Sequence, residues 1–303
     1  MNTAFSTTRG GDPPGRAEAP DAREAGRICA VAGQGQRDLA GRVAAYPHLF
    51  PPGRFDTALF GVVSLAITFS APWLDSDRLR LTNRAALWAF AVDRLVDAVA
   101  TSRREVTALA TRCRSVAAGA APDPGDGAGA FLAEIRDELS AGGGYESWGP
   151  AWRRELSRML SGMAREWRWV HGGGPRPTVE EYLDNADNLG LSFVFVSFLA
   201  STANPATARD AGALVRAGRA AQRVVRLAND LGTYSADLAS GDLNVLRLGP
   251  DRSQVHRRLD ALLADCAARL ERLRAAHPDP VAYLDRHVRF NLGFYPVADY
   301  WPD

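Results

Sequence analysis

Apolar residues recur at helical spacing in long segments of this chain, and clusters of glycine and proline separate these segments. The spacing predicts helices, because residues three and four apart share one face of a helix. The predicted helical segments are 56–69, 78–118, 131–140, 152–170, 178–199, 206–240, 253–276 and 278 to the C-terminus. No strand pattern is visible, and breaks such as AAPDPGDGAGA and HGGGPRP end the helices. We therefore expect an all-α protein, built as a single large helical bundle around a central cavity.

The first 38 residues differ in composition from the rest of the chain. They combine glycine, proline, alanine and alternating charges without periodic apolar residues, which is typical of disordered segments. We expect a disordered N-terminal tail over residues 1–38 and one helical domain over residues 39–303. The longest apolar run, residues 57–74, approaches the roughly 20 residues of a membrane span, but it contains serine, threonine and proline. We interpret it as a core helix and expect no membrane span.

Charge and residue usage exclude several classes of function. The 36 basic and 35 acidic residues leave a net charge of +1, so no overall field favours nucleic acid. All basic residues are arginine, which excludes a P-loop and a Schiff-base lysine. The three cysteines form no CxxC pair and fit a reducing, cytoplasmic setting. The five histidines lack zinc-ligand spacing; they are His48, His171, His256, His277 and His287.

Two aspartates, Asp93 and Asp97, lie four residues apart in the apolar segment LWAFAVDRLVDAVAT. At this spacing both carboxylates of this aspartate pair leave the same helix face. Paired carboxylates at a cavity suit Mg²⁺, which takes oxygen ligands and keeps water or phosphate oxygens in its shell. The same spacing also occurs on exposed helices, where Arg94 would pair with a nearby carboxylate. The apolar neighbours Phe90 and Leu95 argue against such a solvated face.

A second set of oxygen donors lies in the segment RLANDLGTYSADLASGDLNVL. Asn229, Thr233 and Asp237, here called the triad, are four residues apart and fall on one helix face. Together with the aspartate pair on a facing helix, the triad would clamp a diphosphate between metal ions. Arg226 lies one turn earlier and suits bidentate diphosphate binding. It also continues a stripe of arginines that would otherwise be solvated or ion-paired.

This segment resembles the second metal motif of the class I terpene synthases, Asn-Asp-hydrophobic-x-Ser/Thr-x-x-x-Glu followed by a glycine and another Asn. The matching positions are Asn229, Asp230, Leu231, Thr233, Gly241 and Asn244. Asp237 stands where the family has Glu. The family's aspartate-rich motif is met by Asp93 and Asp97, with Arg94 where an acidic neighbour is expected. This variant resembles bacterial diterpene synthases that accept bicyclic, labdane-type diphosphates.

The resemblance covers about residues 50–303 and implies the class I terpenoid synthase fold. It implies a Mg²⁺-dependent enzyme that ionises an isoprenoid diphosphate and releases a terpene hydrocarbon or alcohol. Asp93 and the triad would then be catalytic, the pair and the triad would hold three Mg²⁺ ions, and Arg226 would bind the diphosphate. The cation needs a dry pocket with aromatic faces, for which Phe90 is our candidate. Members of the family are often dimers, so a homodimer is also expected.

Two regions depart from the family pattern. The diphosphate-sensing Arg usually follows a Tyr by four residues, and EEYLDNADNLG has Ala186 at that position. Leu189 and Gly190 still predict a helix break there, whose freed carbonyls can face the substrate. The closing Arg-Tyr pair of many bacterial members is altered in the C-terminal segment VRFNLGFYPVADYWPD. The candidates for that pair are Arg289, Tyr295 and Tyr300.

Other functions compete with a labdane-type diterpene synthase. A sesquiterpene cyclase or a cyclase of a linear C20 diphosphate would use the same fold and the same motifs. A prenyl-chain elongase typically has a second DDxxD motif and a basic site that often contains lysine, and the sequence shows neither. A non-catalytic bundle that binds an isoprenoid diphosphate or a protein partner is the alternative from another class. Only the altered Arg positions favour it.

Overall fold

The computed structural model describes residues 21–202 and 204–301, and within these ranges the secondary structure is helical, without strands. The all-α prediction is confirmed. In chain order the elements are α1 (Ala22–Val43), α2 (Thr57–Ser70), α3 (Ser76–Arg94), the π-helix η1 (Leu95–Val99), α4 (Arg103–Ala117), α5 (Gly127–Ala141), α6 (Tyr145–His171), α7 (Val179–Asp184), the 3₁₀-helix η2 (Ala186–Leu189), α8 (Leu191–Thr202), the 3₁₀-helix η3 (Pro205–Asp210), α9 (Ala211–Ser240), the 3₁₀-helix η4 (Val245–Leu248), α10 (Arg252–Arg274) and α11 (Pro278–Phe294).

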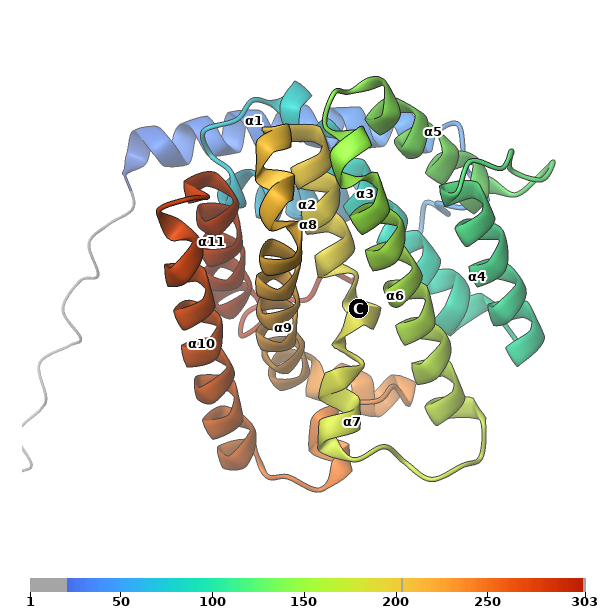
Figure 1. The fold of residues 1–303 in the computed structure, drawn as a ribbon. Coiled ribbons are helices and arrows are strands. Elements are labelled where there is room, and N and C mark those ends of the chain that lie inside the picture. Colours follow the sequence, from blue (N-terminus) through green and yellow to red (C-terminus); the bar gives the residue numbers. More distant parts are fainter. Residues whose placement is uncertain (1–20, 203, 302–303) are drawn as a thin grey trace, which may run out of the picture.

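The long helices run roughly alongside one another and form a bundle (Figure 1). α9 lies in the middle and packs against α8, α10 and α11, while α3 packs against α2, α5 and α8. α1 crosses one end of the bundle over α2 and α3, and α7 lies at the opposite end (Figure 1). Within the described ranges, no helix combines the length and the apolar character that crossing a membrane would require.

The centre of the bundle is the short helix α8, whose sequence is apolar on all sides. Every residue from Leu191 to Ala200 is buried, as expected for a helix without a solvent face. Phe193 packs against the rings of Trp88 and Trp152, each at 5.6 Å between ring centroids. Both indoles satisfy their N–H groups, Trp88 on the Ala128 carbonyl and Trp152 on the Ser197 hydroxyl. These aromatic residues therefore serve the core.

The predicted disordered tail over residues 1–38 is wrong for its second half. Residues 22–38 belong to α1, and residues 1–20 lie outside the described residues. The buried face of α1 consists of Ile28, Ala32, Gly35 and Leu39 at helical spacing. Small residues are required on this face, because a Cβ at Gly35 would lie 2.2 Å from the hydroxyl oxygen of Ser64. This buried face is hard to recognise in the sequence, because only two of its four residues are large and apolar.

The single helix predicted over residues 78–118 is also wrong, because the chain turns within it. α3 ends at Arg94, one π-helical turn follows, and the backbone is extended at Ala100 before α4 begins. Ser102 caps α4 by accepting a hydrogen bond from the backbone N–H of Glu105. π-helical turns often mark functional sites, and this one contains Asp97.

The helix break predicted at Leu189 and Gly190 is confirmed. η2 ends at Leu189, and Gly190 takes a left-handed conformation with φ of 72° before α8 begins. A side chain at Gly190 would also collide with the core, because its Cβ would lie 2.7 Å from the sulfur of Met159. Both the backbone conformation and the lack of space require glycine here.

Candidate active site between two helix walls

A cavity of about 260 Å³ lies between α2, α3, α6, α8, α9 and α11. One part of its lining is apolar and comes mainly from α2, α3, α8 and α9; it includes Val63, Ile67, Ala86, Ala89, Phe90, Leu191, Val194 and Val225. The other part carries many of the polar groups, which include Asp93, Asp97, Asn188, Arg226, Asn229, Thr233, Asp237 and Asp242. The structure thus gathers the aspartate pair, the triad, Arg226 and Phe90 around one cavity, as the sequence predicts.

The aspartate pair forms one wall of this cavity, at the end of α3 and in η1. Burial and, to a lesser extent, the nearby carboxylate of Glu166 together raise the pKa of Asp93 to about 7. The pKa of Asp97 is raised well above its ordinary value by loss of water and by the charge of Asp93. The Trp301 side chain hydrogen-bonds the Asp93 carboxylate. The pair is thus a set of buried carboxylate oxygens that would favour a bound cation.

The triad forms the facing wall on α9, and hydrogen bonds hold two of its members. The Thr233 hydroxyl contacts the Asp237 carboxylate at 2.8 Å and the Asn229 carbonyl at 3.0 Å. Asn244 donates from its side-chain amide to Asp237 at 2.8 Å and to the carbonyl of Asp230 at 2.8 Å. Burial raises the pKa of Asp237, and these hydrogen bonds oppose that rise.

Arg226 is buried beside the triad, within a network of polar groups. Its Nη2 donates to Glu166 at 2.7 Å, and its Nε donates to the Tyr182 hydroxyl at 2.6 Å. The guanidinium also lies 4.3 Å from the centre of the Tyr182 ring. Tyr182 in turn donates to Asp230 at 2.8 Å. Among the described residues that line the cavity, Arg226 is the single arginine.

Glu166 on α6 was not identified from the sequence, although it joins Arg226 to the helix break. Besides Arg226, its carboxylate accepts a hydrogen bond from the side-chain amide of Asn188, which lies in η2 next to Leu189. Ala186, where the family's sensing Arg would stand, is buried and does not line the cavity, whereas Leu189 does. The helix η2 therefore offers the cavity no arginine.

The C-terminal segment covers the polar part of the cavity. Phe90 packs against Tyr300 at 5.5 Å and against Trp301 at 5.3 Å. Tyr295 lines the cavity as well, and its side chain hydrogen-bonds Asn229. Gly232 permits this close packing, since a Cβ there would lie 2.3 Å from the Tyr295 carbonyl oxygen. Tyr295 and Tyr300 thus reach the site.

Arg289, the third candidate of the C-terminal segment, does not reach the site. Its side chain is 76% exposed and pairs with Asp285 on the same helix at 3.0 Å. It does not line the cavity. The expectation that Arg289 binds substrate is therefore not supported by its position.

The donor set fits magnesium with a phosphate ligand. Its members are carboxylate, amide and hydroxyl oxygens on two facing helices, which is the set that Mg²⁺ uses when substrate phosphates complete its shell. The described residues hold no close group of three His, Cys, Asp or Glu side chains of the kind that binds zinc. Burial is the largest cause of the raised pKa values of Asp93 and Asp97, and neighbouring carboxylates add to it, so a bound cation would be favoured at this wall.

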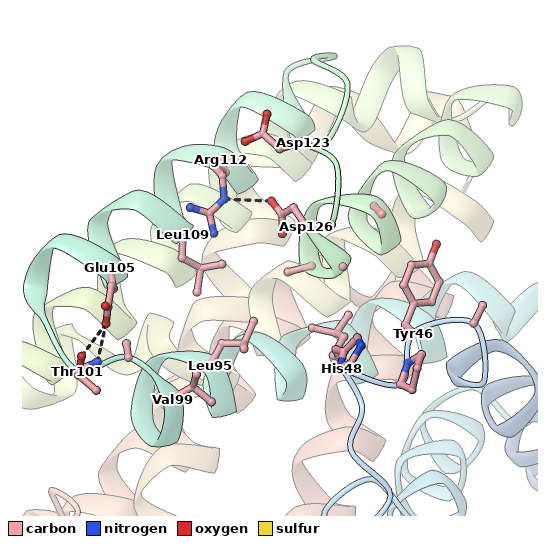
Figure 2. A pocket seen from close by; sticks show the side chains of 18 residues that line it. Tyr46, His48, Leu95, Val99, Thr101, Glu105, Leu109, Arg112, Asp123 and Asp126 are labelled. Atoms are coloured by element: carbon pink, nitrogen blue, oxygen red, sulfur yellow. Dashed lines mark hydrogen bonds and ion pairs between the residues drawn. The ribbon is translucent and has the colours of Figure 1, made fainter.

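A second hollow of about 700 Å³ lies on the other side of η1 (Figure 2). Leu95 and Val99 line it, whereas Asp97 of the same element lines the site cavity. Its polar groups largely pair among themselves: Arg112 contacts Asp126 at 3.1 Å, and Glu105 accepts hydrogen bonds from Thr101. The larger hollow is an open groove without convergent metal ligands, so we assign the chemistry to the smaller cavity.

The sequence matches a family described as terpene synthase family 2, C-terminal metal binding, over residues 84–248. This range contains the aspartate pair and the triad. A curated relative, ent-pimara-9(11),15-diene synthase of Streptomyces sp. (strain KO-3988), is 24% identical over 269 residues, which are 87% of this chain and 89% of the relative.

Solved structures share the fold at lower identity. One is 2-methylisoborneol synthase from Streptomyces coelicolor A3(2), in complex with Mg²⁺ and geranyl-S-thiolodiphosphate. It has a TM-score of 0.69 and 18% identity, over 90% of this chain and 95% of that structure. Wild-type cucumene synthase has a TM-score of 0.66 and 18% identity, over 88% of this chain and 96% of that structure.

Proposed function

The chain belongs to terpene synthase family 2, whose members are lyases acting on isoprenoid diphosphates, and on that premise we propose that its substrate is a bicyclic, labdane-type C20 diphosphate. The observation that carries the proposal is the convergence of the aspartate pair, the triad and Arg226 on one cavity. The rest of that lining is largely apolar. A charged leaving group and a hydrocarbon would thus each find a suitable part of the same cavity.

The polar part of the cavity would bind the diphosphate. Asp93 and the triad would hold Mg²⁺, with Asp97 assisting, and we propose three ions as the resemblance implies. Magnesium bound there supplies Lewis-acid stabilisation of the charge that grows on the leaving diphosphate. Arg226 would add a guanidinium. Its Nη1 makes a long contact of 3.3 Å to Glu166, so this nitrogen can turn most readily toward an anion.

The apolar part would hold the cation that ionisation leaves. Phe90 lies between the aspartate pair and the C-terminal rings, so its face can stabilise positive charge near the departing diphosphate. Tyr300 and Trp301 would exclude water from the same end. Leu189 and Gly190 would bring the helix break to the substrate, because Leu189, the last residue of η2, lines the cavity.

Two likenesses support a bicyclic C20 substrate. The aspartate pair, with Arg94 inside it, resembles the motif of bacterial diterpene synthases that accept bicyclic diphosphates. The curated relative is named for a pimaradiene, a tricyclic C20 hydrocarbon. A tricyclic product is one ring closure away from a bicyclic diphosphate.

A C15 substrate is the second candidate, and the cavity volume favours it. The cavity of about 260 Å³ lies below the roughly 300–1,000 Å³ of typical ligand pockets. A structure of hedycaryol synthase in complex with nerolidol, which is 17% identical with a TM-score of 0.66, shares the fold. On the C20 hypothesis, Tyr300 and Trp301 would have to move away from Phe90 to make room.

The test is incubation of the purified protein with Mg²⁺ and, separately, geranyl, farnesyl, geranylgeranyl and copalyl-type diphosphates. Released diphosphate is quantified and hydrocarbons are identified by gas chromatography with mass detection. Product from the copalyl-type substrate alone supports the proposal, and product from farnesyl diphosphate supports the second candidate. Intact substrate in every reaction, with correctly folded protein, contradicts both. A parallel set with EDTA is the control for metal dependence.

A further inference from the structure

His287 on α11 lines the site cavity, although no sequence pattern identified it. It lies eight residues before Tyr295, whose side chain bonds Asn229 of the triad. Eight residues of a helix span about 12 Å. His287 therefore lies deep in the cavity, far from the polar end. It is on the same face of the helix as Asn291, which also lines the cavity.

Hydrogen bonds determine which ring nitrogen of His287 carries the proton. The Ser70 hydroxyl lies 2.7 Å from the Ala66 carbonyl and 3.0 Å from Nδ1 of His287. A carbonyl can only accept, and one hydroxyl has one proton, so Ser70 donates to Ala66 and accepts from Nδ1–H. The imidazole is then protonated on Nδ1, which leaves the lone pair on Nε2. The described residues give Nε2 no hydrogen-bond partner.

The surroundings keep this imidazole neutral before reaction and can stabilise it when it is charged. Burial lowers the pKa of His287 to about 4, so the ring is uncharged at neutral pH. The hydrogen bonds from Nδ1 lead through Ser70, the last residue of α2, to the Ala66 carbonyl one turn earlier, near the C-terminal end of that helix. That end of a helix carries partial negative charge, which favours a cation. The fixed helix dipole would thus stabilise the imidazolium that forms when this neutral base takes up a proton.

From this geometry, and resting on the proposed function, we propose that Nε2 of His287 is the base that ends the reaction. It removes a proton from a carbon next to the cationic carbon, at the inner end of the cavity. The electron pair of that C–H bond forms the C=C bond of the product and neutralises the cation. The proton forms the Nε2–H bond of an imidazolium, which returns it to water after the product leaves.

The position of His287 distinguishes it from released diphosphate as the base. Diphosphate would be held by the two walls and Arg226 at the polar end, where it reaches only carbons near the broken C–O bond. A ring carbon of a bicyclic cation that extends toward α2 lies closer to His287. Ile67 and Val63 of the same lining are apolar and offer no other base there.

The test compares wild type, His287→Gln and Ser70→Ala, with His256→Gln on the exposed face of α10 as the matched histidine control. The substrate is the copalyl-type diphosphate, or whichever diphosphate the wild type converts. The amount of each product is measured relative to the amount of diphosphate released. We expect the share of the main hydrocarbon to fall at least tenfold in His287→Gln, with isomeric alkenes or alcohols in its place. In Ser70→Ala, where the ring can take either tautomer, we expect at least a twofold fall. The control keeps the wild-type product.

Unchanged product composition in His287→Gln overturns the inference while leaving the proposed function intact. If His287→Gln does not fold, unchanged composition in Ser70→Ala overturns it instead. Failure of the wild type to release diphosphate overturns the proposed function and the inference together. An independent readout is the ¹⁵N NMR spectrum of the histidine rings. A neutral ring protonated on Nδ1 between pH 6 and 8 supports the inference, and protonation on Nε2 contradicts it.

Discussion

The two walls of the cavity carry similar oxygen donors, but they are held in different ways. On the α9 wall, Thr233 hydrogen-bonds Asp237, and Asp237 also accepts a hydrogen bond from Asn244, which precedes η4. On the opposite wall, the side-chain hydrogen bond to Asp93 from the described part of the chain comes from Trp301, and Asp97 lies in a π-helical turn. The triad is therefore preorganised, whereas the aspartate pair depends on a ligand for its final geometry.

The difference also appears in the charge balance of the two walls. Asn244 and Thr233 hydrogen-bond the Asp237 carboxylate and oppose the rise in its pKa. For the pair, burial is the largest cause of the raised pKa values, and the negative charges of Glu166 and Asp242 add to it. A divalent cation would relieve this repulsion. We infer that metal binding orders the aspartate wall against an existing triad, and the following predictions test that asymmetry.

The largest effect is expected when either wall loses a ligand. Asp93→Asn or Asn229→Ala should lower diphosphate release roughly 10²-fold or more, because charge on the leaving group is then poorly stabilised. Circular dichroism should show an unchanged helical fold. Asp285→Ala, which breaks the exposed contact to Arg289, is the control and should keep wild-type rates. Wild-type rates of diphosphate release in either variant would contradict the assignment of that residue as a metal ligand.

Glu166→Gln tests the network that supports the triad wall. Its carboxylate is the counter-charge of the buried Arg226, and losing one partner of a buried pair typically costs about 3 kcal/mol. Urea unfolding should show a loss of that order. Glu180→Gln removes the exposed pair with Arg258 and should change stability by less than about 0.5 kcal/mol. Equal effects of the two variants would mean that Glu166 has no special structural role.

The pH dependence of stabilisation by Mg²⁺ tests the aspartate wall. With its pKa raised to about 7, Asp93 in the folded, metal-free protein holds a proton between about pH 4 and 7 that the unfolded chain releases. Its contribution to stability therefore falls as pH rises through that window. Mg²⁺ should raise the Tm more at pH 8 than at pH 6, measured by thermal unfolding with MgCl₂ or EDTA.

The same experiment with Asp93→Asn is the control, and the variant should show a weaker pH dependence of the Mg²⁺ effect. Burial also raises the pKa of Asp97 on this wall, so part of the dependence remains in the variant. An equal rise in Tm at both pH values in the wild type would contradict the charge imbalance that we assign to the aspartate pair.

The smallest effect concerns the C-terminal cover. Trp301→Phe keeps a ring against Phe90 but removes the hydrogen bond to Asp93. Because a hydrogen bond contributes about 1 kcal/mol, the Mg²⁺ concentration at half-maximal activity should fall about fivefold. Trp73→Phe, at a partly exposed position away from the cavity, should leave it unchanged. A higher Mg²⁺ requirement in Trp301→Phe would show that the indole helps to position Asp93.

The sequence predicted the parts of the site that lie on regular helices. Helical spacing brought the triad to one face of α9, and it brought Asp93 and Asp97 to the cavity although Asp97 lies in the π-helical turn that follows α3. The break at Gly190 was predictable because glycine with its neighbours interrupts the helical pattern. The outlines of α9, α10 and α11 were predictable since apolar periodicity and Gly or Pro boundaries mark them.

Other features depend on contacts between segments, which spacing does not contain. Glu166 lies among arginines and tryptophans and has the pattern of a surface residue until Arg226 packs against it. His287 likewise shows no pattern without Ser70, which is 217 residues away. The helix α1 was missed because small residues form its packing face. The homodimer, the cytoplasmic location and the number of metal ions stay predictions.

The central claim is that both walls bind metal ions around one diphosphate. The most direct measurement is a crystal structure of the full chain with Mg²⁺ and inorganic diphosphate. We predict Mg²⁺ ions that join Asp93 on one side and Asn229, Thr233 and Asp237 on the other to a diphosphate within reach of Arg226. Diphosphate bound elsewhere, or metal held by one wall without the other, would contradict the account.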